Sequence, residues 1–546
     1  MKRHDMNPRM ADPLSGNLYE SVIGQALAPE SGLPPPRISA AVVLWRWREG
    51  GGPDDVDVYW VKRSESLPFM GGWHAFPGGG MSRNDVQVPI SGEPLTGAEA
   101  PPAAGLPESL RDLDEPGPDL LPGLAACALR ELFEETGILL SAPSIDPEEL
   151  PEARRALLAG ERSFADILQG FGVRLDASHL VYAGRWVTPP FAPVRFDNRF
   201  FLLQWPPEAP AQPSIYPGEL EYGTWIAPAE AWEAWRRGDV LAAPPILHTL
   251  EVLSQDGPIK GIDRLRDPAE TNLGPLRRVE LRPGVLVFPL LTHTLPPAAT
   301  TNAYLLGSRE CVLVDPGSSS DRELDHLEQA LAAARDRLGR KVTAIWLTHH
   351  HPDHVGGVER LRASLGVPVL AHPLTAQRLA GRGIEIDGEL HDGQRIVLGG
   401  TYPVLVIHTP GHARGHLCFL EEDERSLLCG DMVSGIGMIV VDPPEGDMDD
   451  YLGSLEKLAG LEPNTLFPGH GPAVKNGEAK LREYIHHRLW RENRIFDAWS
   501  AGMRRPADML PTVYDDVPRQ AWPLAERQIL AHLERLRRLG RIDSLT

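Results

Sequence analysis

Four side chains that bind metals lie within six residues in the second half of the chain, in the stretch Thr-His-His-His-Pro-Asp-His that begins at Thr348. They are His349, His351, Asp353 and His354. Imidazole and carboxylate ligands at this density suit zinc or a similar first-row metal. The split spacing predicts two metals, one held by the His349/His351 pair and the other by Asp353 and His354. Two adjacent metals suit hydrolysis, because they share a hydroxide nucleophile and stabilise both the attacking and the leaving oxygen.

Five apolar, strand-like segments must position this cluster and its partners. Each segment runs into a tight turn that carries a possible ligand or an acid that could orient one. The segments are 312–314 before Asp315, 342–347 before the histidine cluster, 404–407 before His412, 426–429 before Asp431, and 465–467 before His470. We expect strands of one sheet to place such ends at one edge, where they converge on a site.

These five motifs, in this order, resemble those of the metallo-β-lactamase-fold hydrolases over residues 278–480. The resemblance implies one zinc held by His349, His351 and His412. It implies a second zinc held by Asp353, His354 and His470. Asp431 would bridge the two metals, and Asp315 would orient ligands from behind, as outer carboxylates commonly do.

Two further inferences concern single positions in this region. Asp353 could act as a ligand, as a proton shuttle, or as both. Asp431 stands where lactam-hydrolysing members carry cysteine, which argues against antibiotic hydrolysis as the main role. Three other histidines, His416, His372 and His391, are expected to be ordinary core or surface residues.

A second acidic cluster lies upstream, in Arg-Glu-Leu-Phe-Glu-Glu-Thr-Gly-Ile from Arg130 to Ile138. The pattern predicts a helix over about 123–136 that ends at Gly137. Glu134 and Glu135 follow Glu131 by three and four residues, so the helix places all three on one face. Like charges in this arrangement repel unless cations lie among them, which suits Mg²⁺ or Mn²⁺ and substrate phosphates. The alternative is a solvated acidic helix face.

The same string resembles the core of the Nudix box, and Trp-His-Ala-Phe-Pro-Gly-Gly at 73–79 resembles the strand and glycine entry to that box. Arg130 follows Gly79 by 51 residues, far more than usual, and Asp85 stands where the family usually has glutamate. This split box, with the segments at 195–201 and around Glu219/Glu221, resembles the branch that includes coenzyme A diphosphatases. The resemblance implies Mg²⁺-dependent hydrolysis of a nucleoside diphosphate linked to another group, with Glu134 and Glu135 catalytic and Arg130 orienting the glutamates.

Length and composition predict a multidomain protein of the cytoplasm. The chain has 546 residues, which is too long for one ordinary core. Its hydrophobic content of 42% is that of a soluble globular protein. Its four cysteines form no disulfide framework, it has no long apolar run for a membrane span, and its net charge of −21 disfavours global attraction to nucleic acid. The predicted units are a flexible arm (1–35), a Nudix domain (36–255) with an insertion at about 85–122, a linker (256–277), a lactamase-fold domain (278–480) and a C-terminal domain (481–546).

The C-terminal residues carry an arginine-rich helix, predicted over about 526–539. Arg535, Arg537, Arg538 and Arg541 gather near its end, where cations also favour the helix dipole. The helix and the segment 513–518 resemble a small winged-helix-like domain found in the branch of beta-lactamase-like protein 2, which includes endoribonucleases. That resemblance implies single-stranded RNA as a partner, although no aromatic stacking platform is visible.

The fold class expected from these patterns is α/β and α+β multidomain: a Nudix α/β/α sandwich, a lactamase-type αββα sandwich and a small helical domain. The leading functional hypothesis is a bifunctional hydrolase with a Nudix diphosphatase and a dinuclear-zinc domain. For the zinc domain we place RNA phosphodiester hydrolysis slightly ahead of thioester hydrolysis on acyl-coenzyme A-like substrates. The Nudix half could instead be a module that senses a nucleotide or coenzyme A-like small molecule without cleaving it. The sequence leaves the oligomeric state open.

Overall fold

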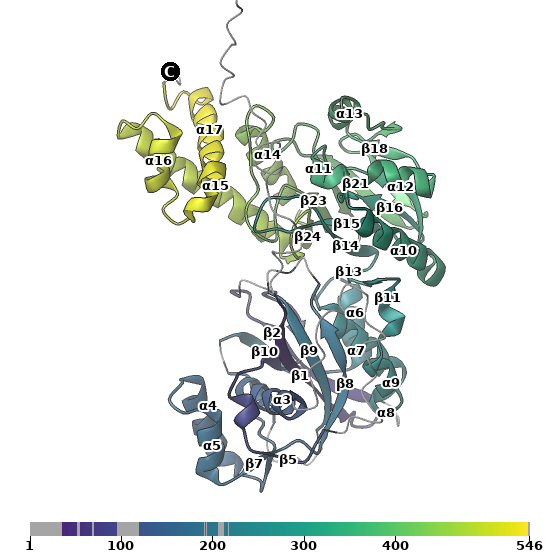
Figure 1. Cartoon of the computed structure of the whole chain (residues 1–546), viewed down its shortest axis with the longest axis vertical. Helices are drawn as coiled ribbons and strands as arrows, with labels where there is room; N and C mark the ends of the chain where they lie inside the picture. The colour runs from purple at the N-terminus through teal and green to yellow at the C-terminus, as the bar shows by residue number, and fades with distance from the viewer. Residues whose placement is uncertain are drawn as a thin grey trace, which may run out of the picture.

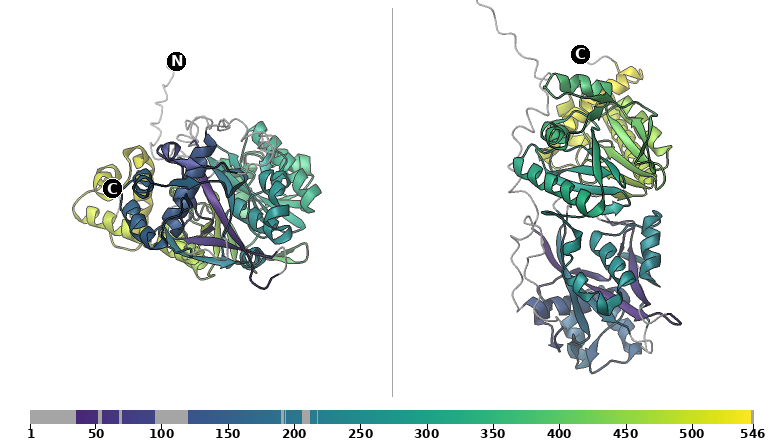
Figure 2. Two further views of the ribbon diagram at one scale, coloured as in Figure 1. Left: turned by 90° about the horizontal axis from the view of Figure 1, so that it is seen from below. Right: turned by 90° about the vertical axis from the view of Figure 1, so that its right-hand side faces the viewer.

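The computed structural model describes residues 35–51, 55–67, 70–94, 120–189, 192, 194–205, 212–216 and 218–543. Its elements form two bodies stacked one above the other, with a group of C-terminal helices beside the upper body (Figures 1 and 2). Residues 1–34 of the predicted arm and residues 95–119 of the predicted insertion lie outside the described part of the chain.

The first body is a mixed sheet with helices on both faces. Its strand order is β10-β2-β1-β9-β8, with β1 and β9 parallel, β3 paired to β2 and β4 paired to β1. β1 alternates between two cores: Ala40, Val42 and Leu44 pack with α3, whereas the residues between them pack with α6 and α7. A strand covered on both faces is apolar throughout, as the sequence of β1 is.

The bounds of the elements in this body are β1 (Arg37–Trp47), β2 (Val56–Arg63), β3 (His74–Ala75), β4 (Gly78–Gly80), η3 (Asp85–Gln87), β5 (Ile90–Ser91), α3 (Leu120–Thr136), β6 (Ser141–Ala142), η5 (Pro147–Glu149), α4 (Leu150–Leu158), α5 (Phe164–Phe171), β7 (Arg174–Asp176), β8 (Leu180–Val187), β9 (Phe196–Gln204), β10 (Leu220–Ile226), α6 (Pro228–Arg236) and α7 (Pro244–Gln255).

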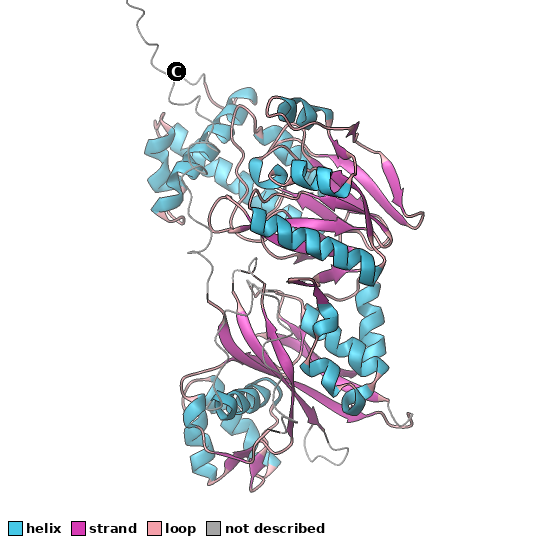
Figure 3. Cartoon of the chain, turned by 45° about the vertical axis from the view of Figure 1, so that its right-hand side comes forward, coloured by secondary structure: helices cyan, strands magenta, loops and turns pink. Residues whose placement is uncertain are grey.

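The second body is a four-layered sandwich of two sheets. One sheet has the order β13-β14-β15-β16-β17-β18-β19 and the other β20-β21-β22-β23-β24-β25. An apolar core lies between the sheets, and separate cores pack α10 and α12 outside the first sheet and α14 outside the second. Figure 3 shows these helices on the outside of the paired sheets.

The bounds here are β13 (Glu280–Arg282), β14 (Val285–Leu291), β15 (Thr300–Leu306), β16 (Glu310–Val314), α10 (Asp321–Leu338), β17 (Lys341–Trp346), α11 (Pro352–Val355), α12 (Val358–Leu365), β18 (Val369–Ala371), α13 (Pro373–Ala380), β19 (Gly388–Glu389), β20 (Arg395–Leu398), β21 (Tyr402–His408), β22 (Leu417–Glu421), β23 (Ser426–Gly430), α14 (Met448–Ala459), β24 (Thr465–Pro468) and β25 (Val474–Lys475).

The five ligand-bearing strands come from both sheets, so the expectation of a single sheet is wrong. β16 and β17 belong to the first sheet, and β21, β23 and β24 belong to the second. Each sheet is apolar on both faces, which requires a partner sheet on one side and helices on the other. The site therefore lies where the edges of two facing sheets meet.

The segment predicted as a linker, 256–277, carries short helices and a hairpin. It forms α8 (Gly257–Lys260), α9 (Ile262–Arg266), η6 (Ala269–Thr271) and the hairpin β11 (Asn272–Leu273) and β12 (Leu276–Arg277). Leu265 is buried in the core on the α6/α7 face of the first sheet, and Arg266 donates to the carbonyl of Tyr182 at 3.0 Å. The apolar residues among its polar ones fix this segment to the first body.

Three helices complete the described chain: α15 (Gly477–Ser500), α16 (Pro506–Val513) and α17 (Trp522–Arg538). They share a core of their own. Among the described residues, all four cysteines are free and buried, and no described helix combines the length and the apolar character that crossing a membrane requires.

The two bodies share an apolar core and a set of buried hydrogen bonds. Trp73 and Leu241 of the first body pack into the core between the two sheets of the second. Arg282, at the end of β13, is fully buried and donates to the carbonyls of Gly238 (2.7 Å) and Val240 (2.8 Å) and to the hydroxyl of Thr465 (3.1 Å). These bonds fix one body against the other.

Candidate active sites

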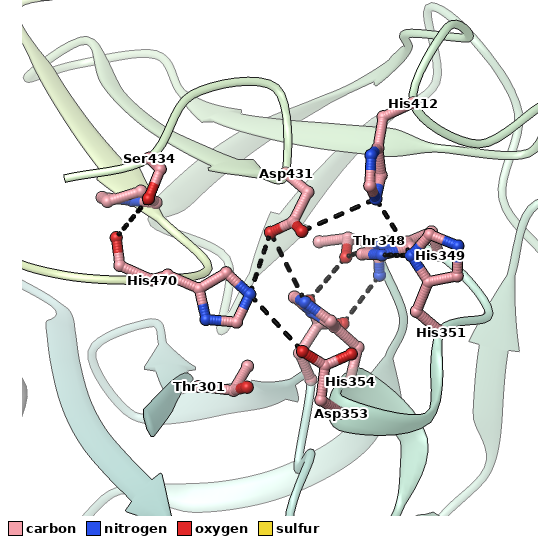
Figure 4. A network of polar contacts seen from close by, with 12 residues as sticks. Thr301, Thr348, His349, His351, Asp353, His354, His412, Asp431, Ser434 and His470 are labelled. Atoms are coloured by element: carbon pink, nitrogen blue, oxygen red, sulfur yellow. Dashed lines mark hydrogen bonds and ion pairs between the residues drawn. The ribbon is translucent and has the colours of Figure 1, made fainter. Parts of the chain in front are cut away.

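The predicted metal ligands of the second body converge at one edge of the sandwich (Figure 4). His349 and His351 lie in the loop after β17, and α11 carries Asp353 and His354. The three remaining residues follow β21, β23 and β24; they are His412, Asp431 and His470. All seven side chains are buried. The structure thus brings together every residue that the sequence motifs singled out.

Three imidazole nitrogens form the first group. Nδ1 of His351 lies 2.9 Å from Nε2 of His349 and 2.9 Å from Nε2 of His412. His412 donates from Nδ1 to the carbonyl of Val440 at 2.7 Å, so its Nε2 carries a lone pair. Nδ1 of His349 lies 2.9 Å from the hydroxyl of Thr348. That hydroxyl gives its own proton to Asp315, so it accepts from His349, and Nε2 of His349 also carries a lone pair. Lone pairs that face one another at this distance fit a cation between them.

The second group combines two imidazoles with two carboxylates. Nε2 of His470 lies 3.5 Å from Oδ2 of Asp353 and 3.5 Å from Oδ1 of Asp431. His470 donates from Nδ1 to the carbonyl of Thr300 at 2.9 Å, and His354 donates from Nδ1 to Asp315 at 2.8 Å. Both rings therefore turn Nε2 inward. Nε2 of His354 and Oδ1 of Asp431 are buried without a hydrogen-bond partner within the described chain, as ligand atoms would be.

Asp431 lies between the two groups. Its Oδ1 is 3.5 Å from Nε2 of His354, and its Oδ2 is 3.5 Å from Nε2 of His412. One carboxylate therefore presents one oxygen to each group, which is the geometry of a bridging ligand. Burial opposes its ionisation, but His470 and His354 beside it hold the pKa of the Asp431 carboxyl well below the ordinary value.

Asp315 and Thr348 support the ligands from behind. The Asp315 carboxylate accepts from the N–H of Thr348 (2.8 Å), from the Thr348 hydroxyl (2.5 Å) and from His354. Asp315 has a φ of 49°, in the left-handed region, so these bonds hold a backbone that a non-glycine residue seldom adopts. Sequence analysis missed Thr348, although it stands next to His349.

His416 is the other residue that sequence analysis missed. It was expected to be an ordinary core or surface residue, and it is fully buried. Its Nε2 accepts from the N–H of Asp431 at 3.1 Å, and its Nδ1 contacts the hydroxyl of Thr409 at 2.8 Å. Its position four residues after His412 was the only signal in the sequence. His372 and His391 lie outside this network.

The electrostatics of the two histidine groups differ. Burial lowers the pKa of His349 and His351 well below the ordinary value, so both rings are neutral and able to bind a metal. Burial acts the same way on His354, but Asp431, Asp315 and Asp353 outweigh it and raise the pKa of that ring well above the ordinary value. The second group is thus rich in negative charge, and a cation among these carboxylates would balance it.

A cavity of about 980 Å³ opens over this cluster. Asp353, Asp431, His351, His412 and His470 contribute to its floor. Much of the remaining wall is apolar and comes from loops, with Leu295, Ile384, Ile436, Met438 and Ile439 among its residues. A cavity of this size suits a small organic substrate.

In the first body, α3 carries the acidic cluster and confirms the predicted helix and its end at Gly137, which has a φ of 77°. Arg130 contacts Oε1 of Glu131 at 2.8 Å and Oε1 of Glu134 at 3.2 Å. Its Nε and Nη2 bind both oxygens of Asp85, at 2.8 and 3.0 Å. Asp85 therefore balances the charge of the arginine that orients the glutamates.

Glu131 and Glu135 meet the glycine turn before the helix. The N–H of Gly78 donates to Oε2 of Glu135 at 2.9 Å. A Cβ at Gly79 would lie 2.6 Å from the Glu131 carboxylate, so a larger residue there would displace that carboxylate. Burial raises the pKa of Glu131 to about 7 and that of Glu135 well above the ordinary value. Carboxylate oxygens gathered this closely are a donor set that Mg²⁺ or Mn²⁺ would stabilise.

Comparisons with known proteins match three parts of the chain. The models of the metallo-beta-lactamase superfamily, the NUDT19 Nudix domain and the beta-lactamase associated winged helix domain match residues 297–470, 37–253 and 506–546. A beta-lactamase-like protein 2 homolog of Drosophila melanogaster is 32% identical over 257 residues, which are 44% of this chain and 84% of that protein. An atrochrysone carboxyl ACP thioesterase of Aspergillus chevalieri is 34% identical over 199 residues, covering 36% of this chain and 60% of that protein.

Two solved structures cover the two halves separately. A NUDIX hydrolase from Alicyclobacillus acidocaldarius is 28% identical and covers 40% of this chain and 91% of its own, with a TM-score of 0.33. A metallo-beta-lactamase family protein from Thermus thermophilus is 26% identical and covers 47% of this chain and 94% of its own, with a TM-score of 0.39.

Fold, site and family matches define a metal-dependent hydrolase. The chain belongs to the metallo-β-lactamase superfamily, among the relatives of beta-lactamase-like protein 2, and it carries a Nudix domain before the lactamase-fold domain and a winged-helix domain after it. The expected fold class and the expected class of enzyme are both confirmed.

Proposed function

We propose that the lactamase-fold domain hydrolyses thioesters of the acyl-coenzyme A type and that the Nudix domain hydrolyses the diphosphate of a nucleoside-linked compound. The cavity over the histidine cluster is the observation that carries the first half of this proposal. Its wall is largely apolar, and three arginines also line it, Arg378, Arg382 and Arg527. Arg378 is paired with Glu445, and Arg527 with Asp442. An acyl chain suits the apolar wall, whereas a nucleic-acid strand would need an exposed basic groove.

RNA, which the sequence placed slightly ahead, is less well supported by the tail arginines. Arg538 binds both oxygens of Asp447, at 2.6 and 2.9 Å. Arg535 donates to Asp449 at 2.6 Å and also to Glu492. These cations dock α17 against α14 and α15, so their charge is largely neutralised within the protein. A relative named as an acyl carrier protein thioesterase also favours the thioester.

We assign the metal ligands as the motifs imply, with zinc as the metal. His349, His351 and His412 would hold one ion, Asp353, His354 and His470 the other, and Asp431 both. Bound zinc would supply a hydroxide nucleophile at neutral pH and a Lewis acid for the carbonyl. In the hydrolysis the oxygen of water joins the acyl carbon, the carbon–sulfur bond breaks, and the thiol leaves with a proton.

Two residues of the cavity are placed to manage that proton. Asp353 is buried, lines the cavity and lies 3.5 Å from His470, so it combines a ligand position with access to the leaving group. His350 lines the same cavity, and burial lowers the pKa of its ring to about 4, so it is neutral at pH 7. We propose Asp353 as the group that passes the proton to the leaving sulfur.

In the Nudix domain we propose Glu131, Glu134 and Glu135 as ligands for Mg²⁺ or Mn²⁺ and Arg130 as their positioning residue. Bound metal would neutralise the diphosphate and activate water. The ion pair between Arg130 and Asp85 supports an intact site despite the long insertion. A compound with both bonds, such as an acyl-coenzyme A, would be cut at each end by this protein.

The test is an activity screen of the full chain on acyl-coenzyme A, coenzyme A and single-stranded RNA. We expect His412→Ala to abolish thiol release and leave nucleotide release intact, and Glu134→Gln to do the reverse. His391→Ala and Glu148→Gln are the matched controls, because both side chains are exposed and lie away from the two clusters. The thioester assignment would be overturned if the wild type cleaves RNA but releases no thiol, and if His412→Ala loses that RNA cleavage. Nucleotide release that survives Glu134→Gln and Glu135→Gln would make the Nudix half a sensor.

A further inference from the structure

Residues 439–443, in the loop between β23 and α14, connect the histidine cluster to the C-terminal helices. We call this segment the strap. Four of its five residues line the cavity over the cluster, and its buried residues Ile439 and Val441 belong to the core that packs α14. Helices α15 and α17 lie beside α14 (Figure 1). The strap is therefore a wall of the cavity on one side and a contact of the C-terminal helices on the other.

Three consecutive carbonyls of the strap bind both neighbours. The middle carbonyl, of Val440, accepts from Nδ1 of His412 at 2.7 Å. The carbonyl of the preceding residue accepts from Nη2 of Arg488 in α15 at 2.6 Å. The carbonyl of the following residue accepts from Nε2 of Gln528 in α17 at 3.2 Å. One peptide carbonyl thus serves the metal site, and the C-terminal helices hold the carbonyls on either side of it.

Arg488 and Gln528 also bind each other. Nη1 of Arg488 donates to Oε1 of Gln528 at 2.8 Å, so the amide of Gln528 is fixed with Nε2 toward the strap. The two residues are 2% and 3% exposed. The guanidinium of Arg488 lies 5.2 Å from the ring centroid of Tyr451, a residue of α14. Buried hydrogen-bond networks of this kind hold their members in one geometry.

The residue before Gln528 holds the end of the strap. Nε of Arg527 donates to Oδ1 of Asp442 at 2.5 Å, and its Nη2 donates to the carbonyl of Pro443 at 2.7 Å. Arg527 lines the cavity together with both of these strap residues. Two adjacent residues of α17 therefore fix the strap, and the C-terminal domain contributes a side chain to the cavity wall.

The contact between the strap and His412 decides which ring nitrogen can bind a metal. Because Nδ1 carries the proton that Val440 accepts, the lone pair lies on Nε2, the atom that faces His351 and Asp431. Carbonyls that bind the second nitrogen of a ligand histidine fix both its tautomer and its orientation. A strap that shifted would take this acceptor away from the ring.

We propose that Arg488 and Gln528 are positioning residues of the metal site, which hold the strap so that the Val440 carbonyl keeps Nε2 of His412 directed at the metal. This inference rests on the metal ligands proposed above and does not depend on the substrate. It makes the C-terminal domain a structural part of the hydrolase site.

Gln528→Glu tests the inference, because it removes the Nε2 donor to the strap and keeps an oxygen for Arg488. We measure the zinc affinity of the full chain by competition with a chromophoric chelator. The affinity for one of the two ions should fall roughly tenfold, the lower end of the usual cost of losing a partner behind a ligand. Gln520→Glu is the matched control, with the same change of charge at an exposed position of η7 (Arg519–Ala521) before α17.

Arg488→Lys is a second variant, in case Gln528→Glu does not fold. Lysine keeps the charge but offers one nitrogen where the guanidinium fork binds both Gln528 and the strap. Zinc affinity should again fall roughly tenfold. Arg482→Lys is its control, because this arginine lies on the same helix and its side chain is 64% exposed.

The His412→Ala background separates positioning from general disruption. In that background Gln528→Glu should change the remaining zinc affinity by less than about twofold, because the ligand that the strap orients is gone. A loss as large as that in the wild-type background would show that the substitution acts on the whole site, and it would overturn the inference.

The same measurements distinguish this inference from the proposed function. If the wild type binds zinc and releases thiol while Gln528→Glu and Arg488→Lys match their controls, the inference is wrong and the function stands. If both variants lose zinc affinity but the wild type releases no thiol from acyl-coenzyme A, the thioesterase function is wrong and the inference stands. A wild type that binds no zinc overturns both.

Discussion

Nε2 of His416 accepts a hydrogen bond from the backbone N–H of Asp431 at 3.1 Å. His416 touches none of the substrate cavity, yet it fixes the backbone of the residue that faces both groups of ligands. The ring is neutral, because burial lowers its pKa well below the ordinary value, so Nε2 keeps the lone pair that this bond needs. The bridging carboxylate thus depends on a histidine that holds no metal itself.

We expect His416→Ala to lower metal affinity and kcat by roughly 10- to 100-fold, the usual cost of losing a partner behind a ligand. Metal content after dialysis and thioesterase activity at increasing zinc measure this directly. Excess zinc should restore part of the activity, which a general folding defect would not allow. His391→Ala is the control, because its side chain is exposed. Full metal retention by His416→Ala would contradict the positioning role.

The interdomain hydrogen bonds of Arg282 predict coupled unfolding of the two bodies. Arg282→Met keeps most of the volume but leaves the buried carbonyl of Val240 and the Thr465 hydroxyl without this donor. The carbonyl of Gly238 keeps a bond from Asn464. Each such group costs about 1–3 kcal/mol, so we expect a loss of about 3 kcal/mol or more and two separate unfolding transitions by calorimetry. Arg309→Met, an exposed arginine in the turn before β16, should leave one transition. A single unshifted transition in Arg282→Met would show that the bodies are joined by their apolar contacts alone.

The ion pairs of α17 predict which arginines matter for stability. Glu492 is 3% exposed and is shared by Arg535 and His532. Arg535→Ala removes a cationic partner of this buried carboxylate. Breaking a fully buried ion pair typically costs about 3–5 kcal/mol. We expect a smaller loss of stability here, because Arg535 is 17% exposed. Arg537→Ala, two residues along the helix, should change stability by less than about 0.5 kcal/mol. Urea denaturation of both variants makes the comparison, and equal effects would refute the docking role of Arg535.

Glu421, at the end of β22, predicts a pH dependence of stability. Burial raises the pKa of its carboxyl to about 7, against an ordinary value of about 4.3. Between these values the folded protein holds a proton that the unfolded chain has released, so stability is lost as pH rises through this window. Glu421→Gln removes the titration. We expect its stability relative to the wild type to improve by on the order of 2 kcal/mol between pH 5 and pH 8. A difference that does not change with pH would contradict this.

Local patterns determined much of the architecture. The run of apolar residues in β1, the glutamate spacing in α3 and the strand ends before Asp315, His412, Asp431 and His470 are all short-range features. Each depends on periodicity or on a turn of a few residues, so the sequence alone located them. The short helices and the hairpin of the segment 256–277 were not predicted, because polar residues outnumber the few apolar ones, such as Leu265, that pack against the first body.

The tertiary structure decided what no local pattern carries. The five ligand-bearing strands belong to two sheets, and His351 presents Nδ1 where His349 and His412 present Nε2. Ring orientation follows from outer partners such as Val440 and Thr348, which the fold brings close. The arginines of α17 are likewise neutralised by acids far away in the sequence, such as Asp447, which lies 91 residues before its partner Arg538. Residue type and spacing determine which groups are available, but only packing determines which groups face one another, and the chemistry depends on the second.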